Sequence, residues 1–236
     1  MTAATPDAAL DTRQRELDQT PDPLSKVLAV AGIAGAAIVV VLVGALHVLP
    51  ETAGISPVAR TISEYALTDV GWVFNLGVLA LALGSLAVLA GIVRAGLARP
   101  AAAGIWLGVA WSAALTVIVL FPKHNWAVGP SAGGQIHRVA SIVAFLCLPV
   151  AALALGRAWR GDARWAGFAR ATLWLGVASL AWLVPILLGF VLRPLTGVPW
   201  WQFVPLGPFE RGMALTEIAA LLVTGAWAAL RQLSTS

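Results

Sequence analysis

An uninterrupted apolar segment at residues 27–49 places the strongest constraint on the fold. It contains 23 residues, and its only ionisable side chain is His47, close to its end. Because an α-helix rises 1.5 Å per residue, about 20 apolar residues cross a hydrocarbon layer of ~30 Å. A helix on the surface of a soluble protein would carry a polar stripe, and this segment has none. The segment therefore predicts a membrane-spanning helix.

Five further apolar segments repeat this pattern along the chain. We predict an all-α, six-helix transmembrane bundle whose spans lie at residues 27–49, 70–95, 101–121, 136–156, 168–192 and 211–230. Only 11% of the residues are charged, whereas soluble domains have about 25%. Pro185 lies inside the fifth span, where we expect it to kink the helix or to break one backbone hydrogen bond.

The basic residues that flank the spans indicate how the chain is oriented. Ten Lys and Arg residues lie on the side of the two termini, and five lie on the opposite side. Lys and Arg are enriched in the cytoplasmic loops of membrane proteins. We therefore expect a protein of the bacterial cytoplasmic membrane with both termini in the cytoplasm. Residues 1–26 should form a disordered tail, and residues 231–236 a short C-terminal tail.

Small residues recur along single faces of two spans. Gly77, Gly84 and Gly91 are seven residues apart and share one face of the second span. A second row of small residues occupies residues 104–116 in the third span. Such rows let helix backbones approach closely within a membrane. They favour a compact bundle over separate helices.

Ionisable side chains are concentrated at the ends of the spans that we expect outside the cytoplasm. Glu217 lies seven residues after Glu210, so the two share a face of the sixth span and Glu217 is about 10 Å deeper. An ionisable group inside the membrane costs several kcal/mol unless it faces the bundle interior and has a partner. We expect Arg138 or Arg60 to be that partner. The carboxyl then serves either a structural ion pair or a substrate- or proton-binding site.

These residues suggest a polar pocket on the extracytoplasmic side. His137 and Ser141 are four residues apart and share a helix face. The outer loop at residues 60–71 predicts a short amphipathic helix, and the proline-rich loop at residues 193–209 should lie in the headgroup layer as a lid. The candidate ligand-binding residues are Arg60, Glu64, His137, Arg138, Ser141, Glu210, Arg211 and Glu217.

We favour a non-enzymatic protein whose pocket binds a lipid headgroup or a small polar ligand. Membrane lipids are the expected partners, with no nucleic acid and no cofactor, and the oligomeric state stays open. One alternative is an intramembrane enzyme, such as a lipid hydrolase, that uses His137 and Glu217 as acid and base. A proton-coupled transporter is the other, although the two halves of the chain show no repeat.

A metal site is a weaker alternative. Three histidines, His47, His124 and His137, lie on the same expected side of the membrane. Catalytic zinc sites use three protein ligands and keep one position open. However, the chain has no His-x-x-x-His pair, which is the spacing that places two ligands on one helix face. The predicted metal ligand set is therefore none, with these three histidines as the weak alternative.

The order of several short motifs resembles the bacterial domain-of-unknown-function family 998 (DUF998), from about residue 27 to residue 230. The motifs are Ile62-Ser63-Glu64-Tyr65-Ala66, Asn75, Phe121-Pro122, His137 and Glu210-Arg211. The resemblance implies a six-span bundle distantly similar to the DRAM and Sfk-like membrane proteins, some of which are linked to lipid distribution. The family often has Asp in place of Glu64, and Asp after Phe-Pro in place of Lys123-His124, which argues against the metal site.

Overall fold

The computed structural model describes residues 22–125, 127–197 and 204–233 of the chain. The described part is helical and contains no strand. Six of its helical segments are long and apolar enough to cross a membrane, so the predicted fold class is confirmed. Most of the predicted N-terminal tail, the end of the C-terminal tail and residues 198–203 of the predicted lid lie outside the described residues.

Helix α2 spans Pro23–Leu46 and begins four residues before the predicted span. The Asp22 side chain caps it by accepting a hydrogen bond from the backbone N–H of Leu24 at 3.1 Å. Pro23 occupies the start of the helix, where its missing N–H costs nothing. The cap therefore extends the helix beyond the apolar segment.

The remaining long helices follow the predicted spans with shifted ends. Helices α3 and α4 cover Gly71–Arg94 and Ala103–Leu120. Helix α5 covers Ala132–Trp159, starting earlier than predicted because the Ser131 hydroxyl accepts a hydrogen bond from the Gly134 N–H at 3.1 Å. Helix α9 covers Leu206–Leu233 and also starts earlier than predicted.

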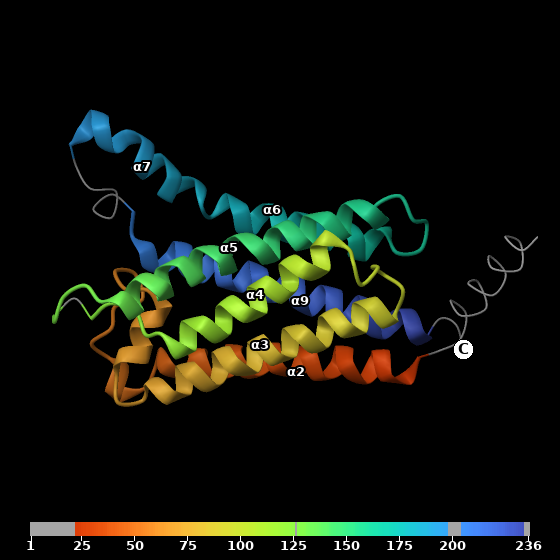
Figure 1. The fold of residues 1–236 in the computed structure, drawn as a ribbon, viewed down its shortest axis with the longest axis horizontal. Helices are drawn as coiled ribbons and strands as arrows, with labels where there is room; N and C mark the ends of the chain where they lie inside the picture. Colours follow the sequence, from red (N-terminus) through yellow and green to blue (C-terminus); the bar gives the residue numbers. More distant parts are fainter. Residues whose placement is uncertain (1–21, 126, 198–203, 234–236) are drawn as a thin grey trace, which may run out of the picture.

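The fifth span is broken in two, as Pro185 predicts. Helix α6 covers Ala166–Ala181, and helix α7 covers Val184–Thr196 with Pro185 in its first turn. Proline lacks the N–H that would continue the hydrogen-bond ladder of α6. Figure 1 shows α7 diverging from the other helices. As a result, α7 extends the span without packing into the bundle.

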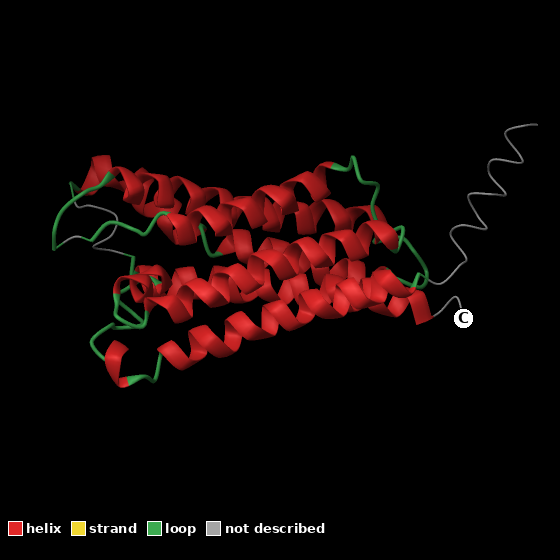
Figure 2. Ribbon diagram, turned by 60° about the horizontal axis from the view of Figure 1, so that its bottom comes forward, coloured by secondary structure: helices red, strands yellow, loops and turns green. Residues whose placement is uncertain are grey.

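The other long helices form a closed ring. Helix α2 packs against α3, and the pairs α3–α4, α4–α5, α5–α6, α6–α9 and α9–α2 complete the ring. Helix α9 also contacts α3 and α5, and Figure 2 shows the connecting loops gathered at the two ends of the bundle. The end with the short helices η1 (Pro50–Thr52) and η2 (Ile62–Leu67) is called the Glu64 end. In Figure 1, α2 begins and α9 ends at the opposite end.

The glycine face predicted on the second span packs against α2. A Cβ atom on Gly84 would lie 3.0 Å from the carbonyl oxygen of Gly32 and 3.1 Å from the Cα of Gly35. Further along the same face, the Ser25 hydroxyl donates a hydrogen bond to the Gly91 carbonyl at 2.9 Å. The small residues let the two backbones touch, and this contact stabilises the pair without large side chains.

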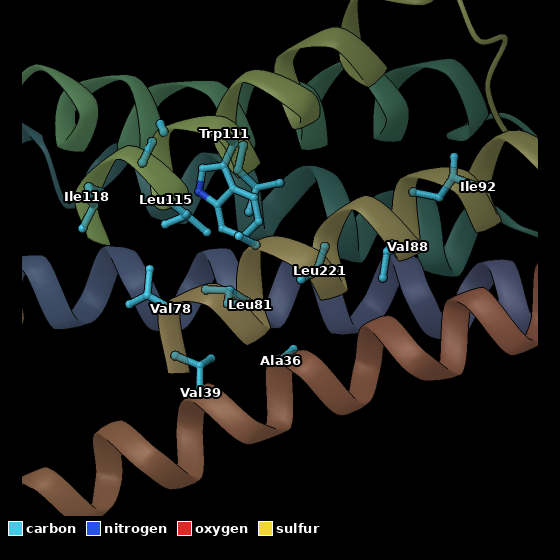
Figure 3. Packing of buried hydrophobic residues seen from close by; sticks show 14 of the residues in the cluster. Ala36, Val39, Val78, Leu81, Val88, Ile92, Trp111, Leu115, Ile118 and Leu221 are labelled. Carbon is cyan, nitrogen blue, oxygen red and sulfur yellow. The ribbon is translucent and has the colours of Figure 1, made fainter. Parts of the chain in front are cut away.

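A buried apolar cluster fills the ring between these helices. Figure 3 shows the indole of Trp111 projecting from α4 towards Leu81 of α3 and Leu221 of α9. Trp111 is only 1% exposed, and Leu81 and Leu221 are also buried. Figure 3 places the indole nitrogen on the side of the ring that faces Ile118, which lies towards the Glu64 end.

Candidate functional site

A cavity of about 300 Å³ lies inside the ring, in the half of the bundle that is nearer the Glu64 end. Helices α2, α3, α4, α5 and α9 and the short helix η2 all contribute to its wall. Most of the wall is apolar, with Val43, Val78 and Leu115 as examples. Six polar side chains with hydroxyl, imidazole or charged groups also line it: His47, Ser63, Ser141, Glu210, Arg211 and Glu217.

Among the described residues that line the cavity, Arg211 is the only cationic one, and most of its donors have protein partners. Its Nε donates a hydrogen bond to His47 Nε2 at 2.8 Å. Its Nη1 donates to the carbonyl oxygens of Arg60 at 2.9 Å and of Gly207 at 3.1 Å. Its Nη2 is buried and has no hydrogen-bond partner among the described residues. The guanidinium is therefore held on two sides and keeps one donor nitrogen unused.

His47 holds Arg211 in position. Its Nδ1 lies 2.7 Å from the Val43 carbonyl oxygen, which can only accept a hydrogen bond. Its Nε2 must accept from Arg211, because a guanidinium can only donate. These two contacts require a neutral imidazole with its proton on Nδ1. The edge of the ring also packs against Tyr65, with 5.2 Å between the ring centroids.

Glu210 connects α9 to the loop before α3. Its Oε2 accepts a hydrogen bond from the backbone N–H of Ile62 at 2.6 Å. Ile62 is the first residue of the short helix η2, a helix that the amphipathic pattern of residues 60–71 predicts. Tyr65 in this helix is fully buried, so the segment packs into the end of the bundle rather than only against a membrane surface.

Glu64 and Arg60 belong to a polar cluster at the Glu64 end and do not line the cavity. Lys123 Nζ lies 2.5 Å from Glu64 Oε2 and donates to the Thr61 hydroxyl at 2.8 Å. Arg60 lies 3.7 Å from Glu64, and its side chain is 56% exposed. Arg60 contributes to the site through its carbonyl oxygen, which accepts from Arg211.

Glu217 lies deeper in the cavity than Glu210 and is only 4% exposed. The Ser179 hydroxyl donates a hydrogen bond to its Oε1 at 3.4 Å. Glu217 is also close enough to the indole of Trp111 to interact with it, but the geometry leaves Trp111 Nε1 without a hydrogen-bond partner among the described residues.

The expected partners of Glu217 are not found next to it. The ion pairs of the described residues join it neither to Arg138 nor to Arg60. Arg138 has an exposed side chain and does not line the cavity. Arg138 lies almost one turn before Ser141 in α5, nearer the Glu64 end, and only Ser141 reaches the cavity wall.

His137 is buried outside the cavity. Its Nδ1 donates hydrogen bonds to the carbonyl oxygens of Phe121 at 2.9 Å and of Ile118 at 3.3 Å. The last carbonyl groups of a helix lack intrahelical partners, so His137 satisfies the end of α4 and fastens α5 to it. The acid–base pair of His137 and Glu217 is therefore not assembled in one cavity.

The three histidines serve separate contacts. Within the part of the chain that the structure describes, no three His, Cys, Asp or Glu side chains converge as metal ligands would. Both ring nitrogens of His47 are engaged by Val43 and Arg211. His124 Nδ1 accepts a hydrogen bond from the Ser131 N–H at 2.9 Å. The alternative ligand set of His47, His124 and His137 thus has no support from this geometry.

Residues that the pocket hypothesis did not include complete the site. His47 appeared only as a metal-ligand alternative, Lys123 appeared only as a departure from the family pattern, and Trp111 and Ser179 did not appear. Trp111 carries a signal in the sequence, because tryptophans of membrane proteins concentrate at the interfaces and this one lies inside a span. Depth alone does not show that such a side chain points inward, since Trp174 also lies inside a helix and is 64% exposed.

The ring of membrane-length helices around an internal cavity defines a multi-pass α-helical membrane protein. The chain belongs to the family described as Protein of unknown function (DUF998), whose family model matches residues 33–228. This match confirms the resemblance that the short motifs indicate. Comparison with curated proteins and with solved structures gave no match.

Proposed function

We propose that this protein binds a membrane amphiphile, with an acyl chain in the cavity and a headgroup oxygen on Arg211. The observation that carries the proposal is the buried Nη2 of Arg211, which lacks a partner among the described residues and belongs to a side chain that lines the cavity. Ligand sites are mostly apolar, with a few polar groups that fix orientation. A carboxylate or phosphate oxygen would form a charge-assisted hydrogen bond with this nitrogen.

The cavity wall suggests that the ligand enters from the bilayer. Val40 of α2 and Leu215 of α9 line the cavity and are also 42% and 59% exposed. Gly44 lies one turn from Val40, and a Cβ atom there would meet nothing within 4 Å. These three residues mark an opening between α2 and α9 that faces the lipid in a membrane. Binding is favoured over hydrolysis because His137 lies outside the cavity.

The test is equilibrium binding of tritiated dodecanoate to the protein in phosphatidylcholine nanodiscs, with binding to empty nanodiscs subtracted. We compare Arg211→Gln with Arg231→Gln, which removes an arginine from the opposite end of the same helix. Losing a hydrogen bond between charged groups costs about 1.5–3 kcal/mol, so Arg211→Gln should weaken binding roughly tenfold or more. Arg231→Gln should bind like the wild type.

A second ligand distinguishes a loss of headgroup recognition from a general structural effect of Arg211→Gln. Dodecanol has the same chain as dodecanoate but no charge, so the wild type should prefer dodecanoate and Arg211→Gln should lose that preference. A merely structural effect would weaken both ligands alike. Equal binding of dodecanoate to the wild type and to Arg211→Gln would overturn the proposal.

We infer from the basic residues that the Glu64 end lies outside the cytoplasm of a bacterial cell. The single cysteine, Cys147, makes this testable by labelling. In a Cys147→Ala background, Ser56→Cys and Gly161→Cys place one thiol at each end of the bundle, at two exposed positions. A membrane-impermeant maleimide should label Ser56→Cys in intact cells and Gly161→Cys only after permeabilisation. The reverse pattern would contradict the orientation.

A further inference from the structure

The deep part of the cavity holds two buried polar groups that have no part in the proposed headgroup contact with Arg211. Trp111 is 1% exposed and Glu217 is 4% exposed, and both line the cavity. The indole nitrogen of Trp111 has no hydrogen-bond partner among the described residues. In Figure 3 this nitrogen points along the bundle towards Ile118, which also lines the cavity. A ligand whose headgroup contacts Arg211 would therefore meet the Trp111 nitrogen along its acyl chain, at a distance from the headgroup.

The hydrogen-bonding chemistry of Trp111 and Glu217 determines which ligand group can pair with both. An indole N–H can only donate a hydrogen bond, and a carboxyl group accepts one through an oxygen that carries no proton. A hydroxyl group does both, so a single hydroxyl can accept from Trp111 and donate to Glu217. A plain hydrocarbon chain would leave the Trp111 nitrogen unpaired and Glu217 with only the long contact from Ser179, and an unpaired buried polar group is costly. The site is thus matched to a hydroxyl on an otherwise apolar chain.

We propose that Trp111 and Glu217 form a subsite for a hydroxyl group on the acyl chain of the ligand, which rests on the proposed function of Arg211 as the headgroup anchor. Glu217 follows Arg211 by six residues in α9, a rise of about 9 Å. Taken as the spacing between headgroup and subsite, this rise corresponds to roughly seven bonds of an extended chain, which advances ~1.3 Å for each bond of ~1.5 Å. The ligand class is a mid-chain hydroxyacyl amphiphile.

A water molecule is the competing occupant of the subsite. Buried waters form two to four hydrogen bonds with polar groups, and Trp111, Glu217 and Ser179 supply that many. If water stays in place when a chain binds, a hydroxyl on the chain brings no advantage. The binding experiment distinguishes the two occupants directly.

The experiment compares dodecanoate with its 3-hydroxy, 8-hydroxy and 12-hydroxy derivatives on the wild type in phosphatidylcholine nanodiscs. We expect 8-hydroxydodecanoate to bind about tenfold more tightly than dodecanoate, which corresponds to ~1.4 kcal/mol. The 3-hydroxy and 12-hydroxy derivatives should show no such gain, because their hydroxyls would lie against apolar wall. Equal affinity of dodecanoate and all three derivatives would overturn the subsite and favour water.

Two variants test whether the subsite causes the preference for 8-hydroxydodecanoate over dodecanoate. Trp111→Phe should reduce the affinity ratio of 8-hydroxydodecanoate to dodecanoate to about one. Trp227→Phe is the matched control, because Trp227 is also fully buried with an unpartnered Nε1 among the described residues but does not line the cavity. It should keep the tenfold ratio. If Trp111→Phe does not fold, Glu217→Leu should abolish the ratio in the same way.

The outcomes separate this proposal from the one on which it rests. If dodecanoate does not bind, or binds independently of Arg211, both proposals fail. If dodecanoate binds through Arg211 but the hydroxyl brings no gain, only the subsite fails. A tenfold gain that survives both Trp111→Phe and Glu217→Leu would also overturn the subsite, because the hydroxyl would then bind elsewhere.

Discussion

Lys123 Nζ lies 2.5 Å from Glu64 Oε2, although 59 residues separate the two in the sequence. The pair joins the short helix η2 to the segment that follows α4. The two side chains are only 15% and 19% exposed, so solvent screens their interaction less than that of a surface pair. Glu64 and the Lys123-His124 pair are the places where the chain departs from the family's short motifs, and the structure brings Glu64 and Lys123 into contact.

A double-mutant cycle measures this ion pair. Glu64→Gln and Lys123→Met each remove one partner, and each should lower the free energy of unfolding by about 1–3 kcal/mol because the remaining group loses its partner. The double variant should be less destabilised than the sum, with a coupling energy of about 1–2 kcal/mol. Unfolding in detergent is the measurement. Additive effects would show that the pair contributes nothing to stability.

Two glycines of α2 should respond differently to the same substitution. A Cβ atom on Gly35 would lie 2.5 Å from the Ala80 carbonyl oxygen and 3.0 Å from the Gly84 Cα, and these backbone atoms cannot move aside. Gly35→Val should therefore destabilise the protein by about 1–3 kcal/mol. Gly44→Val is the control, because a Cβ atom there meets nothing within 4 Å. Equal melting temperatures of the two variants would contradict the close α2–α3 contact.

Asp22 makes the stability of the bundle depend on pH. Its carboxylate lies 2.7 Å from Arg94 Nε, and the hydrogen bond to this guanidinium lowers the pKa of Asp22 below its ordinary value of 3.8. A lowered pKa means that the stabilisation is complete above pH ~4 and is lost as the pH falls towards the lowered pKa. Asp22→Asn keeps a capping side chain and removes the charge.

At neutral pH the wild type should therefore be more stable to unfolding than Asp22→Asn. The difference should shrink as the pH falls below about 4 and the wild-type carboxylate takes up a proton. In an Arg94→Gln background, Asp22→Asn should have little effect on the unfolding curve, because the ion pair is already absent. A gap between the wild type and Asp22→Asn that stays constant down to pH 2 would contradict the ion pair.

Filling the opening between α2 and α9 should block ligand entry. Gly44→Leu adds a side chain where the structure has open space, so we expect an unchanged melting temperature and at least tenfold slower association of dodecanoate. Gly167→Leu is the control, because Gly167 is exposed on α6 and also has nothing within 4 Å of its Cβ position. An unchanged association rate of dodecanoate with Gly44→Leu would exclude this route and favour entry at the Glu64 end.

The sequence predicts the number and order of the spans because each is an apolar segment of membrane length. The break at Pro185 and the glycine face at Gly77, Gly84 and Gly91 follow from single residue types, although Pro149 lies inside α5 without ending it. The helix ends do not follow from hydropathy. Asp22 and Ser131 extend α2 and α5 through caps that lie outside the apolar segments.

The candidate site is harder to predict because a helix that is apolar all round does not show which face points inward. Glu210, Arg211 and Glu217 are ionisable groups within a span, and the structure places all three at the cavity. His137 and Arg138 are neighbours in α5, yet one is buried against the end of α4 and the other is exposed. The rotation of α5 depends on its contacts with α4 and α6, which no local pattern reports.

Photo-crosslinking tests the central claim most directly, namely that an acyl chain occupies the cavity. Dodecanoate with a diazirine at mid-chain is bound to the protein in nanodiscs, irradiated, and located by mass spectrometry of peptides. The account predicts labelling near Leu115 and Ile218, which line the cavity, with protection by excess dodecanoate. Labelling only of exposed residues such as Leu83 and Leu187, without protection, would contradict it.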